Sequence, residues 1–391
     1  MQYRKDISLL GYGCMRFTTR NNKIDLDKAE SEIMRAYELG VNYFDTAYIY
    51  PGSEDALGKI VEKNGIRDKI KIATKLPQYM VKSRAAIDKY FDEELKRLRT
   101  DHVDYYLMHH MTDIAQWEKL VEFGIKEWIE EKKASEQIRH IGFSFHGNTD
   151  MFLKILNAYD WEMCLVQYNY MDEVTQAGKI GVQAAAAKGI PVMIMEPLRG
   201  GRLVNLLPEK AKKAIAEDDH GWTAAEWSFR WLWDQEEVTC VLSGMNDIPM
   251  IEENCRVASD AKAGSFGEKE FGLLEKVKEY INENIKVNCT GCRYCMPCPK
   301  GVDIPGIFSC YNRMYSDNKT TGREDYFHMV ALRREPADAK LCIECGKCEK
   351  HCPQNLPIRE KLKEADKDLR AFPFNIVFKL ARSFMVGKKK K

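Results

Sequence analysis

Two short runs of cysteines in the last third of the chain carry the most reactive side chains of the sequence. Each run holds three cysteines at two-residue gaps and ends on a fourth cysteine followed by proline: Cys289, Cys292, Cys295 and Cys298 in CTGCRYCMPCP, and Cys342, Cys345, Cys348 and Cys352 in CIECGKCEKHCP. The chain opens without the apolar core of a secretory signal, so we expect a cytoplasmic protein. In that compartment such a density of cysteines indicates thiolate ligands of a metal rather than disulfides.

The spacing of the cysteines resembles that of ferredoxins that carry two iron–sulfur clusters. The second run has their C-x2-C-x2-C-x3-C-P pattern, and the first run is one residue shorter before its last cysteine. In these ferredoxins three cysteines of a run and the last cysteine of the other run hold one cluster. The resemblance therefore implies two [4Fe–4S] clusters with crossed ligands, Cys352 completing the cluster of the first triplet and Cys298 that of the second. A single cluster and tetrahedral zinc stay open as alternatives, because C-x2-C pairs also suit zinc.

Short apolar runs alternate with helical patterns through the sequence that precedes the cysteines. Eight of these runs read as strands: 8–13, 43–47, 70–75, 103–109, 138–145, 163–169, 191–197 and 239–244. Most are almost continuously apolar, as expected of parallel strands that are buried on both faces. Eight strand–helix units in series predict an α/β fold, a (β/α)8 TIM barrel of about 250 residues. A doubly wound sheet would need a glycine-rich loop after the first strand, and GYGCMR offers only two glycines.

Two of the intervening segments show clear helix boundaries. In residues 27–40, Asp27 is the predicted N-terminal cap and Gly40 the predicted stop. In residues 83–100, Ser83 is the predicted cap of a helix with apolar residues at helical spacing. We expect helices of this kind to form the outer layer of the barrel.

The chain divides into three parts by composition. We expect the barrel over residues 1–284, a small, mainly helical ferredoxin-type iron–sulfur domain over 285–375 and a basic tail over 376–391. The apolar and basic end of the chain reads either as a membrane-surface helix or as a helix packed on the domain, and we favour the packed helix. A net charge of +1 provides no overall field to attract nucleic acid, and no apolar stretch is long enough for a transmembrane helix.

Four side chains of different chemistry fall at the ends of consecutive predicted strands. Asp45, Lys75 and His109 end the second, third and fourth strands, and Tyr50 follows the second. In a barrel of this kind chemistry sits at the C-terminal ends of the strands. A carboxylate, an ammonium, an imidazole and a phenol are therefore expected to meet at one mouth of the barrel, although each of them alone would read as a cap or a packing residue.

Residues 5–265 resemble the aldo-keto reductases in FDTAYIYPGSEDALGKIV, IATKL and DYYLMHH. In that family an Asp precedes a Tyr by five residues, and a Lys and a His follow the next two strands; Asp45, Tyr50, Lys75 and His109 take these places. The resemblance implies hydride transfer between a nicotinamide and a carbonyl or alcohol. Tyr50 would be the acid/base, with its pKa lowered by Lys75, which Asp45 would hold charged. His109 would orient the substrate oxygen.

The same resemblance implies the contacts of a dinucleotide. Ser144 and Gln167 match the residues that grip the nicotinamide carboxamide in the family. The expected contacts of the pyrophosphate and the adenine follow the last two strands: Gly200 and Gly201 with Arg199 or Arg202 as the counter-charge, and Glu253 and Asn254. An ordinary flexible loop stays open as the alternative for the glycines. Glycines let a backbone approach a pyrophosphate closely, and arginines neutralise its charge.

The chain departs from the family at several of these positions. Phe145 stands where an Asn is usual, and Met195 stands where a Tyr often stacks on the nicotinamide. Gly244 and Met250 replace the Lys and Arg that usually clamp a 2′-phosphate. The cofactor is therefore expected to be NAD(H) or NADP(H), with no preference between them.

These motifs together predict an NAD(P)(H)-dependent oxidoreductase of the aldo-keto reductase type that carries two [4Fe–4S] clusters. Its partners would be a small carbonyl or alcohol substrate and a ferredoxin- or flavin-type redox protein. Clusters pass single electrons, whereas a nicotinamide transfers a hydride, and joining the two normally requires a mediator such as a flavin. Two other readings therefore stay open: an electron-transfer protein in which the barrel docks or regulates, and a barrel enzyme whose clusters are structural or sense oxidants.

Overall fold

A computed structural model describes residues 6–289, 291, 293, 295–333, 335–352 and 354–385. Of the predicted metal ligands, Cys292 lies outside the described residues, as does the lysine-rich end of the tail, residues 386–391.

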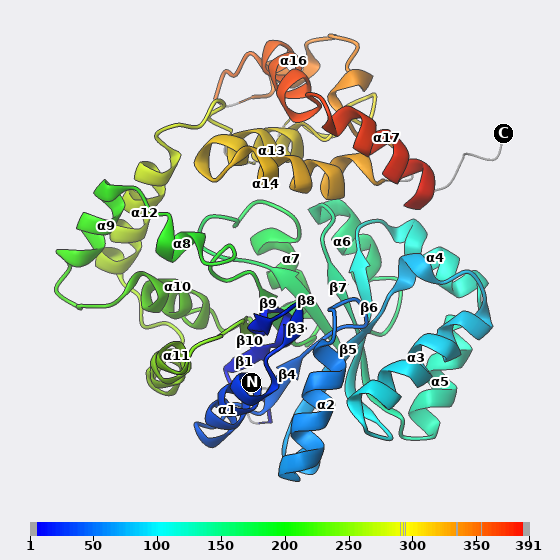
Figure 1. Cartoon of the computed structure of the whole chain (residues 1–391). Helices are drawn as coiled ribbons and strands as arrows, with labels where there is room; N and C mark the ends of the chain where they lie inside the picture. Colours follow the sequence, from blue (N-terminus) through cyan, green and yellow to red (C-terminus); the bar gives the residue numbers. More distant parts are fainter. Residues whose placement is uncertain are drawn as a thin grey trace.

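The barrel forms as the sequence predicts (Figure 1). Its eight parallel strands close in the order β1-β10-β9-β8-β7-β6-β5-β4, with β4 pairing back to β1. Their bounds are β1 Leu10–Gly13, β4 Tyr43–Asp45, β5 Lys71–Leu76, β6 Val103–Met111, β7 Ile138–Phe145, β8 Met163–Gln167, β9 Val192–Met195 and β10 Val238–Ser243. A small antiparallel hairpin, β2 Thr19–Arg20 and β3 Lys23–Ile24, lies outside the barrel sheet. Each predicted strand overlaps one barrel strand, because parallel strands buried on both faces need continuous apolar runs.

Helices surround the strands (Figure 1). They are α1 Leu26–Glu38, α2 Ser53–Asn64, α3 Arg84–Leu98, α4 Ile114–Glu122, α5 Ile125–Ala134, α6 Thr149–Leu156, α7 Gly178–Ala187, α8 Arg202–Asn205, α9 Glu209–Ala216, α10 Ala224–Trp233, α11 Ile248–Asp260 and α12 Glu268–Asn282. The cap of α3 is Ser83, as predicted, and its side chain accepts from the backbone N–H of Ala86. The cap of α1 is Asp25 and not Asp27, because the extended Asp25 reaches the N–H of Lys28 while Asp27 already lies in the first turn.

The barrel contains two apolar cores. One lies between the strands and the helices, and the other fills the barrel interior with side chains such as Tyr43, Leu107 and Met193. Lys75 extends from β5 at the same depth and is 1% exposed. A charged side chain at this depth requires a partner, which the mouth of the barrel provides.

The part of the chain that follows the barrel is mainly helical and has its own core. Its elements are α13 Ile304–Ser316, α14 Lys319–Tyr326, the π-helical turn η5 Phe327–Ala331, the 3-10 turn η6 Ala339–Leu341, α15 Lys347–Lys350, α16 Ile358–Leu369 and α17 Phe374–Met385. Figure 1 shows α13 and α14 as the layer next to the barrel, with α16 beyond them and α17 at their side. Val302, Phe308, Tyr326 and Leu362 belong to the core of this domain. The expected helical iron–sulfur domain thus stands beside the C-terminal ends of the barrel strands.

The start of α17 packs on this domain. Phe378 is 4% exposed and stacks on Phe327 at 5.4 Å between ring centroids, whereas Ile376 and Val377 are half exposed. This contact agrees with a packed helix over the part of the tail that the structure describes. Within that same part of the chain, no helix has the length and apolarity needed to cross a membrane.

Candidate active site

The four predicted catalytic side chains meet at one mouth of the barrel. Lys75 Nζ donates to Asp45 Oδ1 at 2.6 Å and to the carbonyl oxygen of Thr46 at 2.6 Å. The same ammonium lies 5.2 Å from the centre of the Tyr50 ring. The rings of Tyr50 and His109 stand edge to face, with centroids 5.9 Å apart. The turn after β4 and the neighbouring strands β5 and β6 thus bring together residues that are up to 64 positions apart in the sequence.

Burial sets the charges of the pair beneath Tyr50. Burial raises the pKa of the Asp45 carboxyl, and Lys75 opposes this shift. Burial lowers the pKa of Lys75, but Asp45 and Tyr50 more than offset it, so the net pKa lies above the usual value. The ammonium therefore stays charged at neutral pH and holds a fixed positive charge under the phenol.

Tyr50 and His109 are neutral in this environment. Burial raises the pKa of the Tyr50 phenol above its usual value, and the charge of Lys75 only opposes the rise. Lys75 acts on this pKa in the predicted direction, but desolvation of the phenolate outweighs the nearby ammonium. Burial also lowers the pKa of His109 well below its usual value, with Lys75 and His110 adding to the effect. At neutral pH the Tyr50 phenol therefore keeps its proton, and the His109 imidazole is uncharged.

Three further histidines extend from His109 toward the iron–sulfur domain. A bulge in β6 gives His110 a φ of 57°, and its ring stands edge to face with that of His109, with centroids 6.5 Å apart. His110 stacks on His146 at 4.6 Å and meets His328 of η5 at 4.7 Å between ring centroids. Burial lowers the pKa of His328 to about 3. Sequence reasoning missed this cluster, because no spacing links His328 to a strand end of the barrel.

Ser144 and Gln167 end the neighbouring strands β7 and β8. Ser144 Oγ accepts from the backbone N–H of His110 at 2.7 Å, which leaves its O–H available as a donor. Gln167 Nε2 donates to Asp172 Oδ2 at 3.0 Å, and Gln167 Oε1 accepts from Gln176 Nε2 at 2.8 Å. An amide has two N–H donors and two acceptor lone pairs, so one of each remains for a further partner. Asp172 and Gln176 carry no sequence signal for this role.

A cavity of about 390 Å³ follows the ends of β9 and β10. It is lined by four of the predicted dinucleotide contacts: Gly200, Gly201, Glu253 and Asn254. Gly244 and Met250 line the same cavity. The volume of the cavity and the two adjacent glycines suit part of a dinucleotide. A Cβ at Gly200 would occupy space next to Arg16 that the glycine leaves open.

The arginines of this region are placed differently from the sequence expectation. Arg16, which sequence reasoning missed, lines the cavity and lies 3.5 Å from Glu196. Arg199 is instead buried against Asp172, and Arg202 lies 3.4 Å from Asp317 of the helical domain. Arg16 is thus the arginine that faces the glycine loop, while Arg199 and Arg202 belong to a polar network between the domains.

The described cysteines of the two runs line two cavities. A cavity of about 300 Å³ is lined by Cys295 and by a group of four: Cys298, Cys342, Cys345 and Cys348. A smaller cavity is lined by Cys289, Cys295 and Cys352. The larger cavity thus holds the second triplet with Cys298 and Cys295 of the first run, and the smaller cavity holds two thiols of the first triplet with Cys352 of the second run. The thiol donors fit [4Fe–4S] clusters, and this grouping is the one that crossed ligands require.

Cys310 lies apart from both groups. It is 1% exposed in the core of the helical domain. This burial agrees with its place off the two cysteine patterns.

Known proteins resemble the barrel over most of their own length. An uncharacterised oxidoreductase of Bacillus subtilis, YqkF, is 27% identical over 287 residues, which cover 65% of this chain and 88% of that protein. L-galactose dehydrogenase of Arabidopsis thaliana is 24% identical over 305 residues, 70% of this chain and 92% of that protein.

Solved structures show the same barrel. The aldo-keto reductase AKR11C1 from Bacillus halodurans superimposes with a TM-score of 0.58 at 25% identity, over 69% of this chain and 92% of that one. An aldo-keto reductase from Klebsiella pneumoniae in complex with NADPH shares the fold, with a TM-score of 0.58 at 21% identity over 70% and 91% of the two chains.

Two family models divide the chain between them. Residues 288–356 match the 4Fe-4S dicluster domain. Residues 9–277 match the aldo/keto reductase family. This chain belongs to that family and is an oxidoreductase in which an iron–sulfur domain follows the barrel in the sequence.

Proposed function

We propose that the protein is an NAD(P)(H)-dependent oxidoreductase that transfers hydride to or from a small carbonyl or alcohol, with Tyr50 as the acid/base. The observation that carries this proposal is the buried Lys75–Asp45 pair under the Tyr50 ring. His109 completes the group from the next strand. A preorganised proton donor beside a fixed positive charge suits the charge that develops on a carbonyl oxygen during reduction.

The bound nicotinamide supplies the hydride. As negative charge grows on the substrate oxygen, the Tyr50 phenol gives it a proton and becomes a phenolate. Lys75 stabilises the phenolate by its charge, and Asp45 keeps Lys75 protonated and oriented. His109 is neutral, so its N–H can donate to the substrate oxygen without competing as an acid. In the direction of alcohol oxidation Tyr50 takes the proton back.

The dinucleotide would lie along the ends of β7 to β10. Ser144 would donate its O–H to the nicotinamide carboxamide, and Gln167 would offer its remaining N–H and lone pair. Gly200, Gly201, Glu253 and Asn254 would line the rest of the cofactor, with Arg16 as the counter-charge. We assign Arg202 to the network with Asp317 rather than to the pyrophosphate, and the choice of NAD or NADP stays open.

The helical domain would hold two [4Fe–4S] clusters with crossed ligands. The grouping of the described thiols in two cavities supports this assignment, and Cys292 would add the remaining ligand of the first cluster. Cys345 is exposed, so the second cluster would lie near the surface, where a ferredoxin- or flavin-type partner can exchange electrons with it. Such thiolate clusters suit the reducing cytoplasm.

The substitution Tyr50→Phe tests the assignment of the acid/base. The rate of carbonyl reduction should fall by a factor of about 10² to 10⁴, because the proton donor is lost. Dinucleotide affinity should stay at the wild-type value. Tyr48→Phe is the matched control, since the Tyr48 hydroxyl donates to Glu93 outside the group of four. Turnover retained in Tyr50→Phe would overturn the proposal.

An electron-transfer role with a docking barrel is the second candidate. It is favoured by the contact of the helical domain with the barrel mouth, where His328 meets His110. Anaerobic addition of NADH or NADPH distinguishes the two. Bleaching of the cluster absorbance would show that the clusters receive electrons from the nicotinamide site. An unchanged spectrum during normal carbonyl turnover would mean that the clusters have a structural role or exchange electrons with a separate partner.

A further inference from the structure

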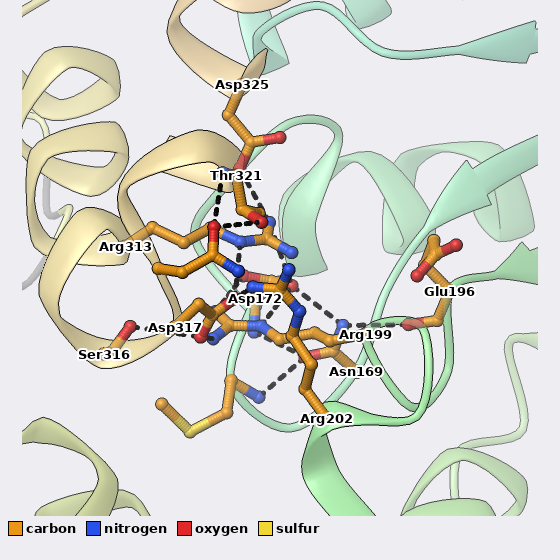
Figure 2. A network of polar contacts seen from close by, with 12 residues as sticks. Asn169, Asp172, Glu196, Arg199, Arg202, Arg313, Ser316, Asp317, Thr321 and Asp325 are labelled. Atoms are coloured by element: carbon orange, nitrogen blue, oxygen red, sulfur yellow. Dashed lines mark hydrogen bonds and ion pairs between the residues drawn. The ribbon is translucent and has the colours of Figure 1, made fainter. Parts of the chain in front are cut away.

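A buried network of charges joins the barrel to the iron–sulfur domain (Figure 2). On the barrel side it contains Asp172 from the loop after β8 and Arg199 from the loop after β9. On the other side it contains Arg313 and Asp317, from the end of α13 and just beyond it, and Asp325 of α14. Neither the catalytic group nor the cysteines require these contacts.

The contacts run without a break from one domain to the other. Asp172 Oδ2 accepts from Gln167 Nε2 at 3.0 Å and from Arg199 Nε at 2.9 Å. Arg199 Nη1 in turn donates to Asp317 Oδ1 at 3.0 Å. Arg313 Nε donates to Asp317 Oδ2 at 3.0 Å, and its Nη1 lies 3.8 Å from Asp172 Oδ2. Figure 2 shows Asp172, Arg199, Arg313 and Asp317 pointing toward one another from the two domains.

These charges are removed from water. Asp172, Arg199 and Arg313 are 1%, 7% and 9% exposed. Burial alone would raise the pKa of Asp172, but Arg199 and Arg313 hold it well below the usual range. A buried ion pair that loses one partner leaves an uncompensated charge, which costs several kcal/mol. The position of Asp172 therefore depends on arginines from both domains.

Asp172 decides which way the Gln167 amide faces. A carboxylate only accepts hydrogen bonds, so the Gln167 nitrogen must point toward it. The Gln167 oxygen then points toward Gln176, which donates to it. Asn169 Nδ2 also donates to Asp172 at 2.8 Å and fixes the same carboxylate. An amide without this neighbour could turn over and exchange its donor and acceptor sides.

We propose that Arg313 and Asp317 of the iron–sulfur domain are positioning residues of the nicotinamide site, acting through Arg199 and Asp172 on the amide of Gln167. The inference rests on the proposed function, which places Gln167 against the nicotinamide carboxamide. The iron–sulfur domain is then part of the cofactor site and not an appendage of the barrel. Because linkage is reciprocal, a bound nicotinamide also stabilises the contact between the domains.

Titration of Arg313→Gln with two ligands tests the inference. NADH or NADPH carries the nicotinamide, and ADP-ribose or its 2′-phosphate lacks it. The variant should bind the reduced dinucleotide about tenfold more weakly than the wild type, with its affinity for the ADP-ribose ligand unchanged. The KM for the dinucleotide should rise accordingly, while kcat at saturation changes less than about twofold. Arg313→Lys, which keeps the charge, should recover part of the lost affinity.

Arg323→Gln is the matched control, because Arg323 donates to the carbonyl of Asp368 inside the same domain, outside the network. It should bind both ligands as the wild type does. If Arg313→Gln binds both ligands more weakly by the same factor, or binds both as the wild type does, the inference is overturned even when wild-type turnover is normal. A wild type that binds neither ligand would overturn the proposed function itself. Should Arg313→Gln fail to fold, the ratio of the two ligand affinities can be measured in Arg313→Lys and Asp317→Asn instead.

Discussion

The two sides of the barrel mouth are built in different ways. On the β4–β6 side, Lys75 bonds to Asp45 and to the backbone of Thr46, so the charged pair is completed within adjacent strands of the barrel. On the β7–β9 side, Gln167 is held by Asp172, whose charge is balanced by Arg199 and by Arg313 of another domain. The proposed proton chemistry is therefore self-contained, whereas the proposed grip on the nicotinamide is shared between domains.

This difference separates cofactor binding from proton transfer, two properties that a single barrel would combine. Damage to the iron–sulfur domain should weaken cofactor binding before it affects proton transfer. Damage to the β4–β6 side should stop the chemistry and leave the domains joined. Four experiments address this separation, in order of decreasing effect.

The largest effect is expected from Lys75→Gln. The variant removes the fixed charge under Tyr50 and leaves Asp45 without its 2.6 Å partner, so the rate of hydride transfer should fall by a factor of about 10² to 10⁴. Single-turnover kinetics measures this step. Affinity for NADH or NADPH should change little, and Lys59→Gln, which removes an exposed pair with Asp55, should behave as the wild type. Loss of cofactor binding in Lys75→Gln would contradict the separation of proton chemistry on the β4–β6 side from cofactor binding on the β7–β9 side.

A smaller but still severe effect is expected from Asp172→Asn. Arg199 and Arg313 would lose their shared buried carboxylate, and the free energy of unfolding should fall by roughly 3 to 5 kcal/mol. Urea unfolding followed by fluorescence measures the loss. Asp150→Asn is the control, because it removes a pair with Arg293 at the surface between the same domains and should cost at most about 1 kcal/mol. Equal losses in both variants would show that the buried network has no special role.

The next effect depends on pH and concerns His328. Burial among Phe327, His110 and His146 lowers its pKa to about 3 from a usual value of 6.5, so the folded protein keeps it neutral where the unfolded chain protonates it. Its contribution to stability is therefore present above about pH 6.5 and is lost as the pH falls toward about 3. Asp325 acts in the opposite sense, because burial raises its pKa to about 6.

Comparison of the wild type with His328→Gln isolates this contribution. Between about pH 7 and about pH 5 the wild type should lose roughly 2 kcal/mol more of its free energy of unfolding than the variant. Denaturant unfolding at the two pH values measures the difference. Parallel pH profiles would mean that His328 is protonated in the folded protein as easily as in the unfolded chain.

The smallest effect on the cofactor is expected from the cysteines. If the ligands are crossed, Cys298→Ser should lose the cluster of the second triplet and about half of the bound iron, although Cys298 belongs to the first run. Dinucleotide affinity should fall by only a few-fold, through loosening of α13. Iron analysis and cofactor titration of one sample measure both, and Cys255→Ala on the barrel is the control. Loss of the first cluster instead would refute the crossed arrangement.

The sequence predicted the barrel well because its strands are buried on both faces. The resulting apolar runs are visible without knowledge of any contact. Once the strands are placed, barrel geometry requires that Asp45, Lys75 and His109 meet, since parallel strands end on the same side. The error at the cap of α1 is local: Asp25 and Asp27 are both good caps, and only the backbone conformation selects Asp25.

Other features could not be predicted, because they depend on burial or on distant partners. Lys75 was expected to lower the pKa of Tyr50, but the depth of the phenol in the protein raises it. Arg199 and Arg202 read as counter-charges for a pyrophosphate, yet they face Asp317, which directly follows α13. Arg16 faces the cavity instead, and no motif marked it.

The sequence by itself determined the chemistry that each region can offer. Apolar periodicity predicted the barrel, strand-end residues predicted the group of side chains proposed for the proton chemistry, and cysteine spacing predicted thiolate ligands. The tertiary structure alone decided which of these groups share an environment. Placing α13 on the barrel mouth buries Arg313 beside Asp172, and burial removes the water that would otherwise screen and separate these charges. For that reason the link between the proposed cofactor site and the iron–sulfur domain is a property of the fold and not of any motif.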